Sequence, residues 1–271
     1  MKLLFLIFIN LLIFNFTLFS QEADSINNNC SFNSYFKNKP IDAHLLIFSP
    51  LKWNKKDIIA FAGLMSLEAI AFHKDEKIAN VFIKNKNKFT DNSTKYIFQP
   101  LGNVYIVGPS VLLALGIGSI SKYNKLTFFS LTASKSLFYS GFITMAVKYA
   151  AHRHRPYESG LNSNIWDGPS LSSEHHSYLS GHSSTAFSVA TSIASVYHDK
   201  TLLKWSAYTI ATGVALSRVY DDKQWASDVI AGAALGYAVS RFCYNNDKRR
   251  SNFSNITLLP QNNGLLMVYR F

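Results

Sequence analysis

The sequence predicts an all-α fold, a bundle of helices that is followed by a short C-terminal β-hairpin. Apolar residues recur at helical spacing through most of residues 55–246, whereas alternating strand patterns are nearly absent before residue 255. A chain of 271 residues is also long enough for one sizeable domain, and nothing in its composition requires two. We therefore expect one helical domain over residues 55–246.

The first twenty residues have the pattern of a signal peptide. Lys2 precedes an apolar run that continues to Phe19, and the small residue Ser20 follows. Cleavage after this run is the favoured interpretation, because polar sequence follows at once over residues 21–54. A retained anchor is the alternative, since Leu18 is large for its position. We expect an exported protein that is periplasmic or associated with an envelope membrane.

The periodicity predicts the helices in order. A first helix begins at Asn54 or Asp57 and runs to His73, and a second, more polar helix covers 75–86. Four strongly apolar helices are expected at about 104–121, 127–151, 183–198 and 201–218, and a fifth, rich in Ala and Gly, at about 225–242. Two short apolar segments flank Asn262-Asn263-Gly264, which predicts the hairpin within a C-terminal segment at 255–271.

The relation of these helices to a membrane has two interpretations. Residues 97–121 carry no charge and are long enough to cross a bilayer, although prolines and glycines interrupt them. The other apolar runs are divided by Lys135, Lys204 and Asp228 into shorter pieces that are typical of buried helices. We expect a soluble or membrane-associated bundle, with membrane-spanning helices as the alternative.

The charge balance points to anionic partners. The net charge is +11 and the pI is about 9.5, which suits a phosphorylated substrate or an anionic membrane surface. Nucleic acid is not expected as a partner, because the chain reads as exported and its lysines and arginines are scattered. Cys30 and Cys243 would meet an oxidising compartment and could pair, but their separation in the sequence does not give their distance in space. Their spacing fits no metal motif.

A first motif contains two cations seven residues apart. Lys148 and Arg155 can project from one face if the helix continues, and Pro156 should end the element at Arg155. An arginine at a helix exit can offer a bidentate fork to a phosphate group, and a lysine adds a point charge.

A second motif, Ser180-Gly181-His182, precedes a predicted helix. Free backbone N–H groups at a helix start form a ready oxyanion site, and Gly181 allows a ligand to approach the backbone closely. His182 could act there as a general acid. An ordinary helix start that is capped by a serine is the alternative.

A third motif joins the end of one predicted helix to the start of the next. Arg218 follows Ser217, and Gln224 stands four residues before Asp228, so that the last two are expected to share a helix face. A histidine at position 224 could be oriented by the Asp228 carboxylate and act as a nucleophile. A neutral amide at this position cannot perform that role.

Together, in this order and spacing, the three motifs resemble the type 2 phosphatidic acid phosphatase and vanadium haloperoxidase superfamily over roughly residues 100–242. The family pattern is Lys-x6-Arg-Pro, then Pro-Ser-Gly-His, then Ser-Arg-x5-His-x3-Asp. The chain has Leu179 in place of the second proline, and Gln224 in place of the nucleophilic histidine.

The resemblance implies a helical bundle and a phosphomonoesterase that uses no metal and no cofactor. It implies that Lys148, Arg155 and Arg218 bind phosphate with help from Ser180 and Gly181. It further implies that His182 protonates the leaving group and that Asp228 orients the nucleophile. The implied substrate is a phosphorylated lipid or a small phosphate ester.

Gln224 separates the functional hypotheses. The first is an envelope phosphatase whose turnover is impaired by the substitution, and the second is a non-catalytic relative that binds phosphate or a phospholipid headgroup. A haloperoxidase comes third, since the vanadate ligand of that branch is the missing histidine. Four histidines near the motifs could substitute as nucleophiles, although ordinary hydrogen-bonding roles are favoured for each: His152, His154, His175 and His176.

Overall fold

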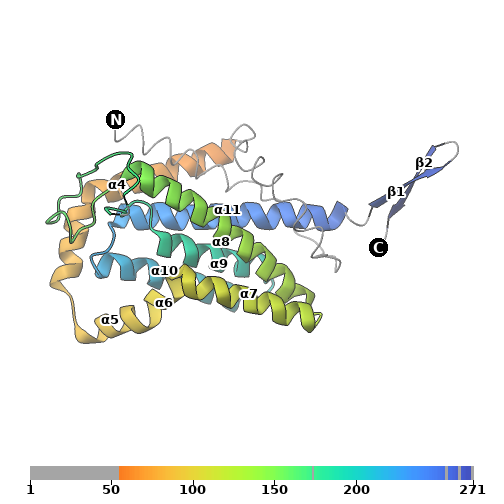
Figure 1. The fold of residues 1–271 in the computed structure, drawn as a ribbon, viewed down its shortest axis with the longest axis horizontal. Coiled ribbons are helices and arrows are strands. Elements are labelled where there is room, and N and C mark those ends of the chain that lie inside the picture. The colour runs from red at the N-terminus through yellow and green to blue at the C-terminus, as the bar shows by residue number, and fades with distance from the viewer. Residues whose placement is uncertain (1–54, 173, 254–255, 262–263, 270–271) are drawn as a thin grey trace.

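The computed structural model describes residues 55–172, 174–253, 256–261 and 264–269, and its domain is a bundle of helices (Figure 1). The signal-peptide prediction, the polar segment 21–54 and Cys30 lie outside these residues. The elements follow in order as α4 (Lys55–Lys84), α5 (Lys88–Ser93), the π-helix η2 (Thr94–Phe98), α6 (Gln99–Gly102), α7 (Val104–Ile120), α8 (Asn124–Ala151), α9 (Gly181–Val196), α10 (Thr201–Tyr220) and α11 (Ala226–Phe253). The all-α prediction is confirmed.

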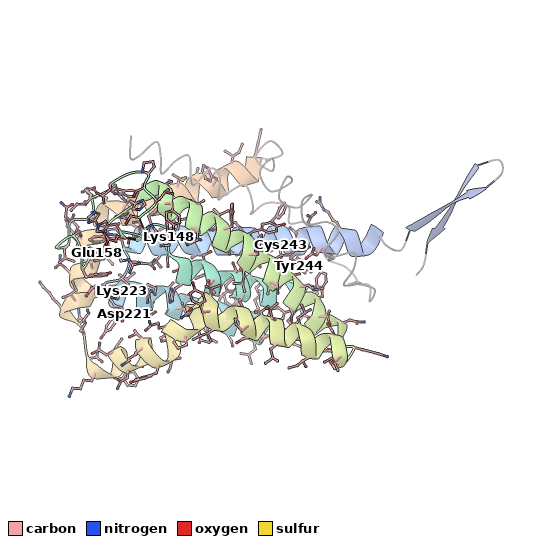
Figure 2. The ribbon with its side chains drawn as sticks, viewed as in Figure 1. Lys148, Glu158, Asp221, Lys223, Cys243 and Tyr244 are labelled. Atoms are coloured by element: carbon pink, nitrogen blue, oxygen red, sulfur yellow. The ribbon has the colours of Figure 1, made fainter. Side chains whose placement is uncertain are left out.

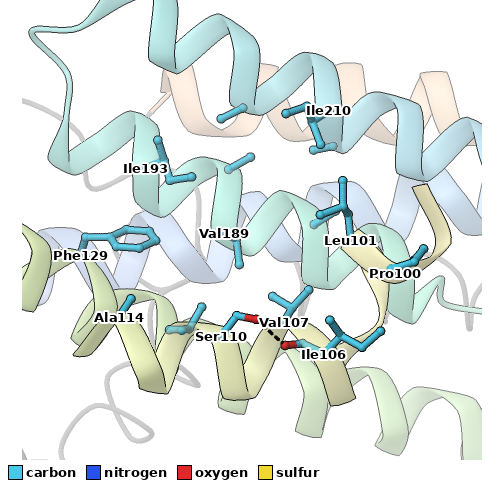
Figure 3. Close-up of a pocket in the computed structure, with 15 residues that line it drawn as sticks. Pro100, Leu101, Ile106, Val107, Ser110, Ala114, Phe129, Val189, Ile193 and Ile210 are labelled. Carbon is cyan, nitrogen blue, oxygen red and sulfur yellow. Dashed lines mark hydrogen bonds between the residues drawn. The ribbon is translucent and has the colours of Figure 1, made fainter. Parts of the chain in front are cut away.

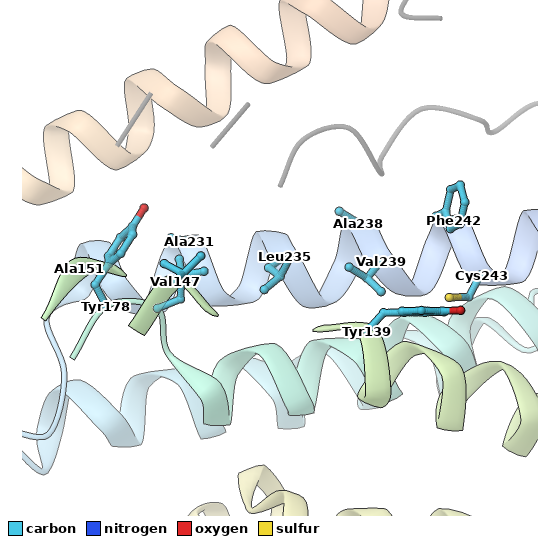
Figure 4. Packing of buried hydrophobic residues seen from close by; sticks show 11 residues of the cluster. Tyr139, Val147, Ala151, Tyr178, Ala231, Leu235, Ala238, Val239, Phe242 and Cys243 are labelled. Carbon is cyan, nitrogen blue, oxygen red and sulfur yellow. The ribbon is translucent and has the colours of Figure 1, made fainter. Parts of the chain in front are cut away.

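Helix α9 lies at the centre of the bundle. It packs against α11, α10 and α8, while α7 covers α8 and α4 crosses α11. The main apolar cluster lies between α8 and α11, where Tyr139 and Val147 meet Leu235 and Val239 (Figure 4). Cys243 is buried in the same cluster, so that it contributes to the core whatever the state of Cys30.

Two predicted helices form one. The polar helix that was expected to start at Asp75 is instead the second half of α4, which is continuous over Lys55–Lys84. Aspartate is a common helix-start signal because its side chain can cap free N–H groups. Here the Asp75 carboxylate bonds to Arg153 and Ser227, far away in the sequence, so that the helix passes through this position without a break.

Small polar residues line a second interface, in which α9 approaches its neighbours closely. Ser192 and Ser240 share a hydrogen bond of 2.8 Å between their hydroxyls, and Ser140 and Ser188 share one of 3.1 Å. A Cβ atom at Gly236 would collide with the backbone of α9. These contacts fix the position of α9 along its axis relative to α11 and α8. We call the five residues that form them the serine seam: Ser140, Ser188, Ser192, Gly236 and Ser240.

Strands β1 (Ile256–Gln261) and β2 (Gly264–Tyr269) follow α11 and pair antiparallel, from Ile256↔Tyr269 to Gln261↔Gly264. No side chain of either strand is described, so the hairpin enters no argument below.

No single described helix is long and apolar enough to cross a membrane. One bent pair, Lys88–Gly102 with Val104–Ile120, has the required length and composition, with an angle of 55° at its break. The predicted apolar segment 97–121 falls within this pair.

Candidate phosphate site

The first motif leaves its helix earlier than the sequence suggested. Helix α8 ends at Ala151, and His152 adopts the left-handed conformation with φ 41° and ψ 54°, while its N–H caps the carbonyl of Lys148. Arg155 therefore lies in the connection after α8 and not on a continued helix face. The expected position of Arg155 at a helix end is wrong, because the chain turns at His152 before Pro156 can act.

Lys148 and Arg155 nevertheless come together at one end of the bundle. The Lys148 ammonium donates to the carbonyl of His176 at 2.5 Å, which joins the first motif to the segment before the second. Burial lowers the pKa of Lys148 to about 7, and repulsion from Arg155 and Arg218 adds to this shift. Figure 2 shows Lys148 at the end of the bundle where the connections between the motifs gather.

The second motif begins α9 as predicted. Ser180 is the N-cap residue, and its hydroxyl accepts from the N–H of Ser183 at 3.1 Å. The N–H of Ser180 donates to the Asp228 carbonyl at 3.0 Å, and Gly232 lets α11 approach Ser180 without a side chain between them. A Cβ atom at Gly181 would meet only the Thr144 methyl group at 3.8 Å, so the space beside Gly181 is open.

His182 stands beside the cations. A Cβ atom at Gly102 would lie 2.9 Å from the His182 side chain, so α6 packs tightly against this histidine. Burial, with repulsion from Arg218, Lys148 and Arg155, lowers the pKa of His182 to about 3. In the absence of an anion the imidazole is therefore neutral, and a bound phosphate would favour its protonation.

The third motif differs from its predicted geometry. Helix α11 begins at Ala226, so Gln224 lies in the turn before the helix and does not share a helix face with Asp228. The Asp228 carboxylate instead reaches back and accepts the N–H of Trp225 at 3.2 Å, as an acidic residue in a first helical turn commonly does. Gln224 forms no hydrogen bond to Asp228; its amide Nε2 donates to the carbonyl of Ser177 at 3.2 Å.

Asp228 is occupied by a network that the motifs did not predict. Its carboxylate accepts from Arg153 Nη1 at 2.5 Å and from the Ser177 hydroxyl at 2.5 Å. Arg153 is 0% exposed and also pairs with Asp75 at 2.7 Å. Its guanidinium lies over three aromatic rings, those of Phe72, Trp166 and Trp225. Arg153 is thus the counter-charge that the two buried carboxylates share.

The three cations of the motifs lack such partners. Within the described residues, Lys148, Arg155 and Arg218 form no ion pair with a carboxylate, and the Nε atoms of both arginines are buried without a hydrogen-bond partner. Burial lowers the pKa of Arg218, the charge of Asp221 opposes this shift, and repulsion from Arg155 adds to it. Buried donors of this kind are satisfied by an anion.

Three of the four histidines that were considered as substitutes are hydrogen-bonded elsewhere, whereas the Nε2 of His176 is buried without a partner among the described residues. His152 bonds through both ring nitrogens, to the carbonyls of Tyr149 and Ser172. His154 bonds to Asp167 at 2.8 Å, and His175 to Glu158 at 3.2 Å. His176 packs edge-on against Tyr149. None of the four is bonded to Asp228.

One group of these residues has atoms close enough to suggest a metal site. His154, Glu158 and His175 place potential ligand atoms within 4.8 Å of one another. The two imidazole rings, however, are stacked at 3.7 Å with an interplanar angle of 6°. Because nitrogen lone pairs lie in the ring plane, two parallel rings cannot both direct one at the same ion. We therefore assign no metal to this group.

The fold and the site define a class of protein, a helical bundle with a candidate anion site at one end. The comparisons with known proteins support the helical fold. Residues 129–251 match the model of the PAP2 superfamily, which is the type 2 phosphatidic acid phosphatase superfamily.

Two relatives extend the comparison. The chain is 35% identical over 107 residues to a lipid A 1-phosphatase of Porphyromonas gingivalis, a match that covers 38% of this chain and 20% of that protein. The chain thus spans about a fifth of the length of this relative. A transmembrane PAP2-type phosphatidylglycerolphosphate phosphatase from Bacillus subtilis has a similar fold, with a TM-score of 0.51 at 18% identity over 69% of this chain and 96% of the other.

Proposed function

We infer that this chain is a phosphomonoester hydrolase of the cell envelope that acts on a phosphorylated lipid. The observation that carries this inference is the set of three cations beside His182, none of which forms an ion pair with a carboxylate in the described part of the chain. Lys148, Arg155 and Arg218 would bind the phosphoryl oxygens, and the N–H group of Gly181 at the start of α9 would assist them, whereas the N–H of Ser180 is already bonded to the Asp228 carbonyl. His182 would donate a proton to the leaving oxygen.

An apolar pocket favours a lipid over a small phosphate ester. This cavity of about 370 Å³ lies between α6, α7, α9 and α10 (Figure 3). The hydroxyl of Ser110, a polar side chain on its wall, already donates to the carbonyl of Ile106 at 2.8 Å. Ala186 on the wall lies one helical turn after His182 on α9, so an acyl chain could enter close to a headgroup that is bound at the cations.

Exposed apolar side chains support association with an envelope membrane. Five apolar side chains on two helices are each more than half exposed, with Ile120 at 86%. They are Leu113, Ile117 and Ile120 of α7 and Leu202 and Trp205 of α10. Surfaces of this kind are costly in water and suit a lipid environment. Flotation with vesicles, with and without high salt, tests this part of the proposal: loss from the vesicles in high salt would favour a purely electrostatic attachment.

Turnover is the point on which the second candidate differs. Gln224 cannot form the phosphohistidine of the family pattern, and loss of a nucleophile typically costs about 10⁴ to 10⁶ in rate. The retained cations would also suit a relative that binds a phosphorylated headgroup without hydrolysing it. The site residues support the anion pocket in both cases.

Phosphate release from phosphatidic acid in mixed micelles tests the proposal. We expect slow hydrolysis by the native protein, and loss of both hydrolysis and vanadate binding in Arg218→Met. Hydrolysis that is unchanged in Arg218→Met would contradict the assigned site. Vanadate binding by the native protein without any phosphate release would favour the second candidate.

A further inference from the structure

The side chain of Gln224 is buried, and only one of its two amide atoms has a hydrogen-bond partner in the described part of the chain. It is 5% exposed, and its Nε2 donates to the carbonyl of Ser177. Since a carbonyl can only accept, this contact fixes which end of the amide faces Ser177. The other end, Oε1, is a buried acceptor without a partner in the described part of the chain. Leaving such an acceptor without a hydrogen-bond partner is unfavourable, which indicates a ligand with a hydrogen to donate.

The position of Gln224 connects this acceptor to the phosphate site. Its N–H donates to the carbonyl of Arg218 at 3.2 Å. The residue that its side chain contacts, Ser177, follows His176, whose carbonyl accepts from Lys148. Gln224 is therefore held between Arg218 and the segment that Lys148 contacts.

The charge of the site limits what the Gln224 oxygen can accept. The unsatisfied atoms of Arg155, Arg218 and His182 are nitrogens that suit phosphoryl oxygens, but Oε1 would be repelled by an ionised phosphoryl oxygen. A water molecule can donate a hydrogen to Oε1 and direct a lone pair at phosphorus. Glutamine orients the attacking water in this way in GTP-hydrolysing enzymes.

Asp228 is not placed to accept a proton from a water molecule that is bound at Gln224. The Asp228 carboxylate is taken up by Arg153, Ser177 and the N–H of Trp225, and it bonds to no atom of Gln224. Asp228 is therefore not the base for this water, and in our scheme a phosphoryl oxygen takes the proton.

We propose that Gln224 orients a water molecule for direct in-line attack on phosphorus, so that this chain hydrolyses its ester in one displacement without a phosphoenzyme. The proposal rests on the phosphatase function above. As the water oxygen bonds to phosphorus, the ester P–O bond breaks and its electron pair leaves with the alcohol oxygen, which takes a proton from His182. One proton of the water stays on the product phosphate, and the other restores the proton of His182.

Stereochemistry at phosphorus tests this proposal. One displacement inverts the configuration, whereas a phosphohistidine route inverts it twice and so retains it. We suggest hydrolysis of para-nitrophenyl thiophosphate, made chiral with oxygen isotopes, in isotopically labelled water. Inversion by the native protein, with no alkali-stable label on the protein after quenching, is the expected result. Retention, or a covalent label, would overturn the proposal.

Variants at Gln224 provide the matched comparison. In Gln224→Ala we expect kcat to fall about 10²-fold through loss of the oriented water, with a much smaller change in KM. Gln224→His should instead give retention and an alkali-stable label. Gln99→Ala, at an exposed glutamine of α6, should leave kcat unchanged. A kcat for Gln224→Ala equal to that of the native protein contradicts an orienting role.

The same assays separate this proposal from the proposed function. A native protein without turnover overturns the role of Gln224. If Gln224→His is then active, the phosphatase site stands and only the water mechanism fails. If the native protein and Gln224→His are both inert and neither binds vanadate, the proposed function fails together with the inference.

Discussion

Arg153 and Arg155 are two residues apart, yet only Arg153 is paired with carboxylates in the described part of the chain. Arg153 is 0% exposed and pairs with Asp75 and Asp228, while Phe72 and two tryptophans cover its guanidinium. Arg155 has a weak contact at 3.4 Å to the Tyr157 hydroxyl, and its Nε is unsatisfied. One arginine is neutralised within the protein, and the other is left to meet a ligand.

The difference teaches how a buried site can hold unpaired cations. Two buried carboxylates, those of Asp75 and Asp228, are already bound by Arg153, so they do not compete with phosphate for Arg155 or Lys148. A protein that paired every cation internally would have no affinity for the anion. Holding cations buried without counter-ions is unfavourable, and the lowered pKa of Lys148 reflects this, because burial and neighbouring positive charges disfavour its charged form.

The largest effect is expected at Arg153. Arg153→Met leaves two buried carboxylates without a counter-charge, which should lower the free energy of unfolding by about 3–5 kcal/mol. Urea denaturation measures this change. The matched control is Arg155→Met, which should change stability by less than about 0.5 kcal/mol. Equal losses in the two variants would remove the distinction between these arginines.

The second effect concerns anion affinity at Arg155. Arg155→Met removes a charge-assisted contact, and the affinity for vanadate should fall about 30-fold, which corresponds to about 2 kcal/mol. Titration calorimetry measures the affinity. A dissociation constant that stays within a factor of two would place the anion elsewhere.

The third effect is a pH dependence that Lys148 imposes. Its pKa is about 7 without a ligand, and a bound anion raises it, so binding takes up a proton above pH 7. Sulfate, which does not itself titrate in this range, should bind about tenfold more weakly at pH 8 than at pH 6. In Lys148→Arg the charge is permanent, and the dependence should flatten. An identical slope in that variant would assign the proton to another group, with His182 the first to test.

The smallest effect is a gain in stability without ligand. The pKa of Lys148 in the folded protein lies below its unfolded value of 10.5, so the unfolded state binds more protons between about pH 7 and 10.5. Stability from this group therefore rises with pH across that window. Lys148→Met should raise the melting temperature by about 2–4 °C near pH 6, equivalent to about 1 kcal/mol, and by less at pH 9. A lower melting temperature at pH 6 would show that the bond to His176 outweighs burial.

Helix positions could be predicted well because helical periodicity is a local property. The expected helices at about 104–121 and 201–218 match α7 and α10 closely. Local signals failed where a side chain is engaged by a distant partner. Asp75 has the residue type of a helix start, but its carboxylate accepts a hydrogen bond from Arg153, 78 positions away in the sequence.

The candidate site shows the same limit. The motifs identified the cations and His182, which the structure brings together, because residue type and spacing carry that information. They placed Gln224 on the helix of Asp228, whereas the helix starts two residues after Gln224. Arg153 was missed, since no spacing in the sequence links it to Asp75 or Ser177. A buried arginine among aromatic residues could be recognised only once the fold was known.

The serine seam has a consequence for the behaviour of the protein in the cold. The stabilisation from apolar burial weakens on cooling, because exposing apolar surface raises the heat capacity on unfolding. Exposing polar surface lowers the heat capacity change of unfolding instead. The contact between Ser192 and Ser240, and the close approach at Gly236, bury little apolar surface. The seam should therefore keep α9, and with it His182, in place at temperatures at which the apolar cluster between α8 and α11 loses strength.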